Sequence, residues 1–160
     1  IFGGTAVGVV ATLSTTDLFA KDASLVGSKY AAKKIATLAD LASGKPLEFE
    51  YPAKGMTNVL VKLGEKAGGG VGRDADVVAF SATCTHMGGP LGAETYKPAH
   101  KVLGPCPLHL TTFDLTHHGM VVSGHATQSL PQVMLELRGS EVWAVGMMGL
   151  VYGYGHNPKA

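Results

Sequence analysis

The chain has 160 residues and a formal net charge of +1 from 13 basic and 12 acidic side chains. This near-neutral balance argues against nucleic-acid binding, which requires a concentration of basic residues. The length suits one domain with a sizeable core, and the 22 glycines and 8 prolines favour short strands joined by turns.

The N-terminal segment 1–16 carries no charge and consists of apolar or small residues. A helix that crosses a bilayer needs about 20 apolar residues, so this segment is short for a complete span. It is typical of the hydrophobic part of an export signal or of the end of a membrane anchor. We therefore expect residues 1–27 to form a signal-like or anchor-like segment with a linker, and membrane association through residues 1–16.

The remaining residues, 28–160, are expected to form the folded domain, with a helix or turn around 36–41. Short alternating or apolar runs predict strands at 47–51, 58–63, 77–80, 101–103, 120–122, 133–137 and 141–145. The glycine-rich run 68–73 lacks the Lys-Ser/Thr of a phosphate-binding loop and is predicted to be a flexible hairpin connection. Short strands at this spacing predict an antiparallel β sandwich.

Two short segments, Cys84–His86 and Cys106–His109, carry the metal chemistry. Each places one thiol close to one imidazole, and together they contain both cysteines of the chain. A Rieske [2Fe–2S] centre uses this ligand set, with two Cys on one iron and two His on the other. A structural zinc site pairs Cys with Cys and His with His along the sequence, and structural cysteines beside unrelated histidines are a further alternative. The mixed pairs favour the two-iron cluster, with four ligands: Cys84, His86, Cys106 and His109.

The loops that contain these ligands suit a cluster. The first ligand loop, residues 84–91, is rich in glycine, so it can bend tightly and turn backbone N–H groups toward negatively charged sulfides. The second ligand loop, residues 104–109, contains two prolines that pre-set its shape. Hydrogen bonds to the sulfurs also tune the reduction potential of such a centre.

The two loops resemble the cluster-binding loops of Rieske proteins, which have the pattern C-x-H-x-G-C in the first loop and C-x-x-H in the second. The resemblance implies an all-β Rieske-type antiparallel β sandwich with an inserted cluster-binding subdomain at about residues 81–131. It also implies a set of residues around the cluster: Met87, Gly88, Leu108, Thr111, Phe113 and Pro131. The family usually links its two loops by a disulfide, but those positions are Gly89 and Leu108 here, so that bond cannot form.

Residues 104–133 closely resemble the small subunit of bacterial arsenite oxidase, some members of which lack the disulfide. This resemblance implies a heterodimeric oxidoreductase in which a large molybdopterin-containing subunit oxidises arsenite. The chain would pass the electrons to a cytochrome c or a small copper protein. The resemblance also implies a periplasmic location, reached by export of the folded protein on the twin-arginine route.

Two alternatives to this function stay open at this point. The first is the Rieske subunit of a quinol-oxidising cytochrome complex, which would need a full membrane anchor and usually keeps the disulfide. The second, from a different class, is a structural zinc-binding or plain interaction module.

The second ligand loop also carries an expectation about the reduction potential. High-potential Rieske proteins have a Ser two residues and a Tyr four residues after the second His ligand, and both hydroxyls donate to sulfur. The corresponding residues here are Thr111 and Phe113. The resemblance therefore implies that one donor is kept, that the other is lost, and that the potential is lower than in those relatives.

Uncharged loops at 87–91 and 124–131 are expected to cap the cluster and to form a docking surface for the partner. Met87 would shield the cluster, and a charge at Leu91 would disturb docking more than folding. His125 lies in the second of these loops and is a candidate for partner contact. The other histidines outside the two motifs are expected to have surface or hydrogen-bonding roles.

Overall fold

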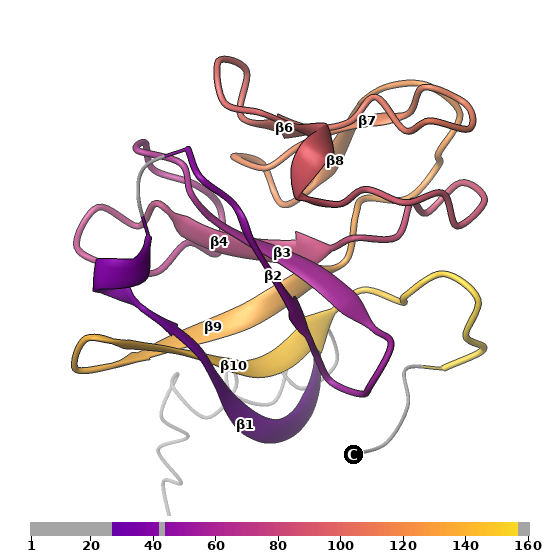
Figure 1. Cartoon of the computed structure of the whole chain (residues 1–160). Coiled ribbons are helices and arrows are strands. Elements are labelled where there is room, and N and C mark those ends of the chain that lie inside the picture. The colour runs from indigo at the N-terminus through magenta and orange to yellow at the C-terminus, as the bar shows by residue number, and fades with distance from the viewer. Residues whose placement is uncertain (1–26, 42–43, 157–160) are drawn as a thin grey trace, which may run out of the picture.

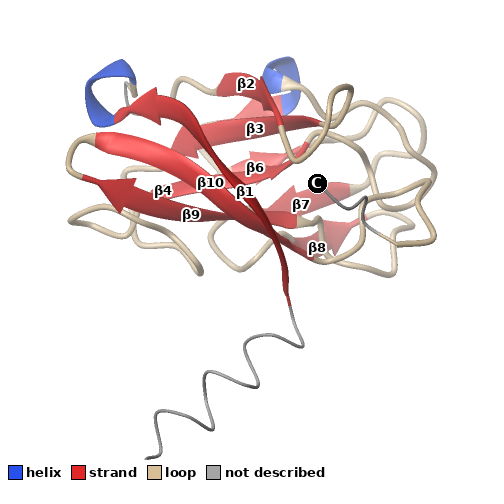
Figure 2. Ribbon diagram, turned by 90° about the horizontal axis from the view of Figure 1, so that it is seen from below, coloured by secondary structure: helices blue, strands red, loops and turns tan. Residues whose placement is uncertain are grey.

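A computed structural model describes residues 27–41 and 44–156 as two antiparallel sheets (Figures 1 and 2). The larger sheet has the order β1-β10-β9-β4-β3-β2 and consists of β1 (Gly27–Thr37), β2 (Leu47–Glu50), β3 (Thr57–Lys62), β4 (Val77–Ser81), β9 (Gln132–Arg138) and β10 (Glu141–Met148). The smaller sheet has the order β5-β6-β7-β8 and consists of β5 (Tyr96–Lys97), β6 (Val102–Leu103), β7 (Thr112–Asp114) and β8 (Met120–Ser123). Two short 3-10 helices, η1 (Leu38–Asp40) and η2 (Ala93–Thr95), lie between strands. The predicted all-β class is confirmed.

The predicted N-terminal segment lies almost entirely outside the described residues. No helix within residues 27–41 and 44–156 is long and apolar enough to cross a bilayer.

Strands β3 and β4 each contain a continuous apolar run, Val59–Val61 and Val77–Phe80, because both of their faces are covered there. Val59 and Phe80 pack in a core that also contains residues of the smaller sheet, whereas Leu60 and Ala79 pack in a second core within the larger sheet. All five residues of β4 are buried. A strand buried on both faces shows a continuous apolar run and not an alternating one, which explains the run predicted as a buried strand at 77–80.

The larger sheet curls until its two edge strands meet. The Lys33 ammonium on β1 donates to the Glu50 carbonyl at the end of β2 at 2.7 Å. The rings of Tyr30 and Tyr51 pack edge to face with their centroids 6.0 Å apart. The strong curvature of β1 is visible in Figure 1. The curl encloses the second core, in which Tyr51 is only 1% exposed.

The first strand is a correction to the expectation for this region. The predicted helix or turn at 36–41 is a 3-10 turn at Leu38–Asp40, and the eleven residues before the turn form β1 along β10. Lysine and alanine dominate this stretch, and both are depleted in strands. Pairing with β10 therefore overrides the local propensity.

The smaller sheet is formed by the part of the chain between β4 and β9. It lies over one face of the larger sheet (Figure 1). The side chain of Gln132, at the start of β9, ties the two parts together. Its amide donates to the Gly68 carbonyl at 2.8 Å, and its oxygen lies 2.8 Å from Nδ1 of His118, in the turn before β8. Gln132 is only 3% exposed, and both bonds are partly buried.

The glycine-rich run joins β3 to β4, as the sequence predicts, and close packing explains its composition. A Cβ atom at Gly68 would lie 2.5 Å from the His118 ring, and one at Gly69 would lie 2.7 Å from the Gln132 amide. The run therefore lets the connection reach the Gln132 side chain.

We predict that Gln132→Leu lowers the free energy of unfolding by about 1–3 kcal/mol, since it leaves the Gly68 carbonyl and His118 without their partner. Chemical denaturation followed by circular dichroism measures this change. Gln128→Leu, at an exposed glutamine with no side-chain hydrogen bond of this kind, is the control and should change stability by less than about 0.5 kcal/mol. Equal effects of the two substitutions would contradict the proposed role of Gln132.

Candidate metal centre

The two ligand loops have the same backbone design. In the first, the Cys84 N–H donates to the Gly89 carbonyl at 2.8 Å, and the Gly88 N–H donates back to the Cys84 carbonyl at 2.9 Å. In the second, Cys106 and Leu110 make the equivalent bonds, the first to the Thr111 carbonyl at 2.8 Å and the second to the Cys106 carbonyl at 2.9 Å. In both loops the residue four positions after the cysteine has a positive φ, +69° at Gly88 and +62° at Leu110. Each loop is thus a closed turn that begins at its cysteine.

Both thiols are buried in the core between the sheets. Cys84 and Cys106 are each 1% exposed and share this core with Phe80, Leu91 and Phe113. Burial raises the pKa of the Cys84 thiol, and the adjacent Cys106 thiol adds to that effect. The backbone N–H groups of His86 and Met87 donate to the Cys84 sulfur and act in the opposite direction. A metal cation would supply the remaining stabilisation that a buried thiolate needs.

The two imidazoles lie together at the outer end of the site. The His86 and His109 ring centroids are 4.7 Å apart, and the ring planes are nearly perpendicular, at 83°. Partial burial, with smaller contributions from His109 and His125, lowers the pKa of His86. The neutral imidazole that this favours is the form that binds metal.

A metal ion fits this arrangement because one buried polar atom has no other partner. Nδ1 of His86 is buried and makes no hydrogen bond, so it is available as a ligand atom. The thiols pair with each other and the imidazoles pair with each other, as a centre with two metal atoms requires. Among the residues that the structure describes, no group of three or more His, Cys, Asp or Glu side chains is placed to hold a single metal ion.

A third histidine lies against the proposed ligands. The His125 ring centroid is 5.5 Å from that of His86 and 6.4 Å from that of His109. Its backbone N–H donates to the Thr111 hydroxyl at 3.1 Å, which ties the loop 124–131 to the second ligand loop. The sequence places His125 in a covering loop, and the structure adds its contact with both imidazoles.

The residues expected around the cluster divide between surface and core. Met87 and Leu108 are 55% and 53% exposed, and each is next in the sequence to a proposed histidine ligand. Leu108 packs over Gly89, where an added Cβ would lie 3.1 Å from its Cγ. Positions 89 and 108 therefore face each other, although neither is a cysteine. Gly88 lies against the ring of Tyr152.

Thr111, Phe113 and Pro131 lie in the interior. Thr111 and Phe113 are fully buried, and Phe113 belongs to the core that contains both cysteines. Pro131 accepts a hydrogen bond from Ser81 N–H at 2.8 Å, at the junction of β4 and β9. Its part in the site is therefore to anchor the loop 124–131 to the larger sheet.

The expected docking role of Leu91 is wrong. Leu91 is 0% exposed and packs in the core between the sheets. Its backbone N–H donates to the Ala82 carbonyl at 2.8 Å, and this hydrogen bond turns the chain inward. Sequence reasoning missed Leu110, which is 65% exposed and has a left-handed backbone. A leucine in that conformation is unusual and can be identified only from the structure.

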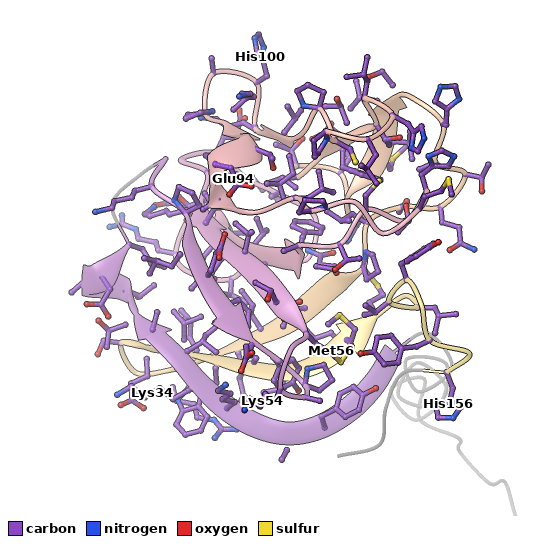
Figure 3. All side chains as sticks on the ribbon, turned by 45° about the vertical axis from the view of Figure 1, so that its right-hand side comes forward. Lys34, Lys54, Met56, Glu94, His100 and His156 are labelled. Atoms are coloured by element: carbon purple, nitrogen blue, oxygen red, sulfur yellow. The ribbon has the colours of Figure 1, made fainter. Side chains whose placement is uncertain are left out.

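The remaining histidines lie away from the imidazole pair. Figure 3 shows His100 and His156 pointing outward at separate edges of the molecule. Nδ1 of His117 lies 2.8 Å from the Asp114 carboxylate, and His118 bonds to Gln132. The structure thus gives His117 and His118 the hydrogen-bonding roles that the sequence predicts.

Comparisons with known proteins agree with this geometry. The model of the Rieske [2Fe-2S] domain matches residues 31–134. Iodate reductase subunit IdrB of Denitromonas iodatirespirans is 57% identical over 98% of this chain and 83% of its own length. The Rieske subunit of the cytochrome bc1 complex of Streptomyces lividans is 37% identical over 37% of this chain and 33% of its own. The soluble domain of Rieske protein II (soxF) from Sulfolobus acidocaldarius superposes with a TM-score of 0.70 at 25% identity, covering 82% of this chain and 85% of that one.

We predict that Cys84→Ser, Cys106→Ser, His86→Ala and His109→Ala each abolish the [2Fe–2S] signal in the electron paramagnetic resonance (EPR) spectrum of the reduced protein. The chain has no spare cysteine, and the rings of His86 and His109, which stand two and three residues after the cysteines in the sequence, pack against each other. His125→Ala is the control, because this side chain touches both imidazoles but is not a proposed ligand. Retention of a full signal in any of the four ligand variants would refute the assignment.

We also predict that Phe113→Tyr raises the midpoint potential by several tens of millivolts. A hydrogen bond to a charged acceptor contributes about 1.5–3 kcal/mol, and about 1.4 kcal/mol of difference between redox states shifts a one-electron couple by about 59 mV. Protein-film voltammetry measures the shift. An unchanged midpoint in a Tyr variant with an intact cluster would exclude the hydrogen-bond explanation.

Proposed function

This chain belongs to the Rieske [2Fe–2S] domain family, and from that premise we propose that it is the electron-transfer subunit of a periplasmic molybdoenzyme that acts on an oxyanion. Its cofactor is a Rieske-type [2Fe–2S] cluster, which accepts and releases one electron at a time when bound. The observation that carries the proposal is the relation along nearly the whole chain to a subunit of iodate reductase.

The residues of this chain give the site a closed end and an open end. The two cysteines lie in the core between the sheets, where water is excluded. The imidazole end is flanked by exposed apolar side chains, including Leu108 and Leu110. A partner can therefore approach the site most closely at its histidine end, and apolar contacts there would exclude water from the interface.

The partner in this proposal is a large molybdopterin-containing subunit, and iodate is its favoured substrate. Iodate reduction consumes electrons, so a cytochrome c or small copper protein would supply electrons that this chain passes to the large subunit. Arsenite oxidation is the second candidate. It is supported by the resemblance of residues 104–133 to the small subunit of arsenite oxidase. In that case the same two partners would exchange electrons in the opposite direction.

The quinol-oxidising alternative has weaker support. The likeness to the bc1 Rieske subunit covers little more than a third of this chain, whereas the likeness to the iodate reductase subunit covers nearly all of it. The proposed periplasmic location is supported by the apolar segment 1–16 and by the resemblance to exported Rieske subunits.

The deciding experiment uses the complex of this chain with its large subunit. The EPR signal of the reduced cluster is followed after rapid mixing. If the proposal is correct, iodate removes the signal from a pre-reduced complex, and arsenite does not create it in an oxidised one. The isolated chain is the control for direct chemical oxidation by iodate. A signal created by arsenite would favour the second candidate, and failure to co-purify with any large molybdoprotein would contradict both.

We predict that Leu110→Asp lowers the turnover of the assembled complex by about tenfold without loss of the cluster, because a charge in a dry interface costs on the order of 1–2 kcal/mol or more. Leu110 is 65% exposed and follows the His109 ligand directly. Met120→Asp is the matched control, at a 56% exposed apolar residue on β8 outside the ligand loops. Unchanged turnover in the Leu110 variant, measured with saturating electron donor, would place the partner elsewhere.

A further inference from the structure

Tyr152, in the segment that follows β10, lies directly against the first ligand loop. A Cβ atom added to Gly88 would lie 2.7 Å from Cε1 and 2.8 Å from Cδ1 of the Tyr152 ring. No Cβ can approach an aromatic carbon so closely without displacing it, so the ring occupies the space that a side chain at position 88 would take. The sequence offers no sign of this contact, because 64 positions separate the two residues.

Gly88 is the position through which this contact can act on the ligands. Its N–H closes the first ligand loop onto the Cys84 carbonyl at 2.9 Å, and its φ is +69°. The two residues just before it, His86 and Met87, donate their backbone N–H groups to the Cys84 sulfur. A shift of Gly88 would therefore move both donors.

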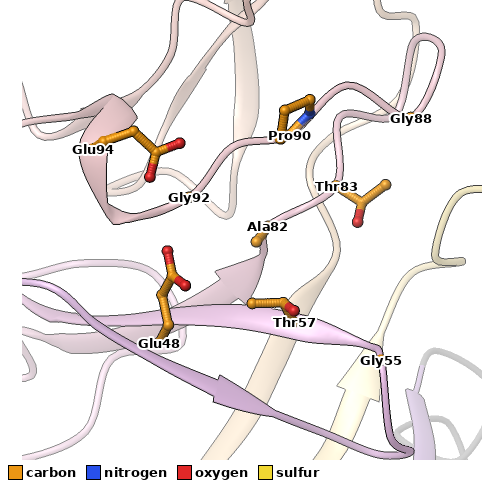
Figure 4. Close-up of a pocket in the computed structure, with 9 residues that line it drawn as sticks. All are labelled: Glu48, Gly55, Thr57, Ala82, Thr83, Gly88, Pro90, Gly92 and Glu94. Carbon is orange, nitrogen blue, oxygen red and sulfur yellow. The ribbon is translucent and has the colours of Figure 1, made fainter.

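The first ligand loop also borders a cavity. Gly88, Thr83 and Pro90 line one side of a cavity whose opposite side is formed by Glu48 of β2 and Glu94 of η2 (Figure 4). The loop thus borders open space, and the Tyr152 ring packs against it at Gly88. The ring is positioned to limit motion of the loop.

The segment that carries Tyr152 is itself anchored to the larger sheet. Val151, the preceding residue, is 4% exposed and packs in the core within that sheet. A Cβ at Gly149 would lie 3.4 Å from the Pro131 Cα, so the segment also packs on the start of β9. Tyr152 therefore connects the rigid part of the molecule to the loop that holds two ligands.

We propose that Tyr152 is a positioning residue for the cluster: its ring holds Gly88, and with it the two backbone N–H groups that donate to the Cys84 sulfur. The contact is made by ring carbons, so the hydroxyl is not required. The proposal depends on the cluster site and is independent of the partner subunit and its substrate.

The test compares Tyr152→Ala, Tyr152→Phe and Tyr154→Ala in the cluster-loaded chain. Tyr154 belongs to the same segment and is similarly exposed, at 44% against 41% for Tyr152, but the contacts at Gly88 come from Tyr152. In Tyr152→Ala we expect loss of the cluster to an iron chelator to be about tenfold faster, which corresponds to about 1.4 kcal/mol in the barrier to loop opening. We also expect a shifted midpoint potential and broadened EPR lines. Tyr152→Phe and Tyr154→Ala should match the unaltered protein in all three measurements.

A second set of variants separates positioning from a loss of overall stability. Gly88→Ala should reproduce the Tyr152→Ala phenotype, and the double variant should lose less than the sum of the two single effects, because removal of the ring makes room for the new Cβ. Additive effects would overturn the proposal. So would a Tyr152→Ala protein that unfolds at a lower temperature but keeps the native EPR spectrum and midpoint.

Discussion

The core between the two sheets is the constraint on which the metal centre depends. It is formed by one face of β3 and β4 together with residues of the smaller sheet, and both cysteines are part of it. A buried thiol is fixed by the packing of its neighbours, so each ligand loop begins at a rigid point. The loops need only carry their histidines a few residues outward to reach the surface.

A cluster site must be shielded from water and must also be accessible to a partner, and this arrangement meets the two requirements at opposite ends of the site. The cysteine end is buried away from water, and a thiolate can be buried there because nearby N–H donors and the metal stabilise its charge. The histidine end must stay within reach of a partner, and His109 is exposed. The equivalent closure of the two loops, Cys84 with Gly88 and Cys106 with Leu110, satisfies both requirements with one backbone design.

The two loops differ in what stands at the position with positive φ. In the first loop it is Gly88, which lies under the Tyr152 ring, and in the second it is Leu110, which points into solvent. A leucine in the left-handed region costs about 1–2 kcal/mol, so its presence at an exposed site is not explained by the stability of the isolated chain. Strain of this kind is concentrated at functional sites. The first loop thus packs against another part of the same chain, at Tyr152, whereas the second has an exposed apolar side chain that a partner could contact.

The sequence alone determined the chemistry and the class of fold. Two Cys/His pairs in glycine- and proline-rich loops predict a ligand set, because side-chain chemistry is local, and short apolar runs between turns predict strands. The sequence could not reveal β1, whose lysines and alanines form a strand only through pairing with β10. It also could not distinguish Leu91, which turns into the core, from Leu108 and Leu110, which stay exposed. Nor could it bring Tyr152 to Gly88 or His125 to the imidazole pair. Contacts between residues far apart in the chain arise when sheets curl and loops close, so only the tertiary structure decides them.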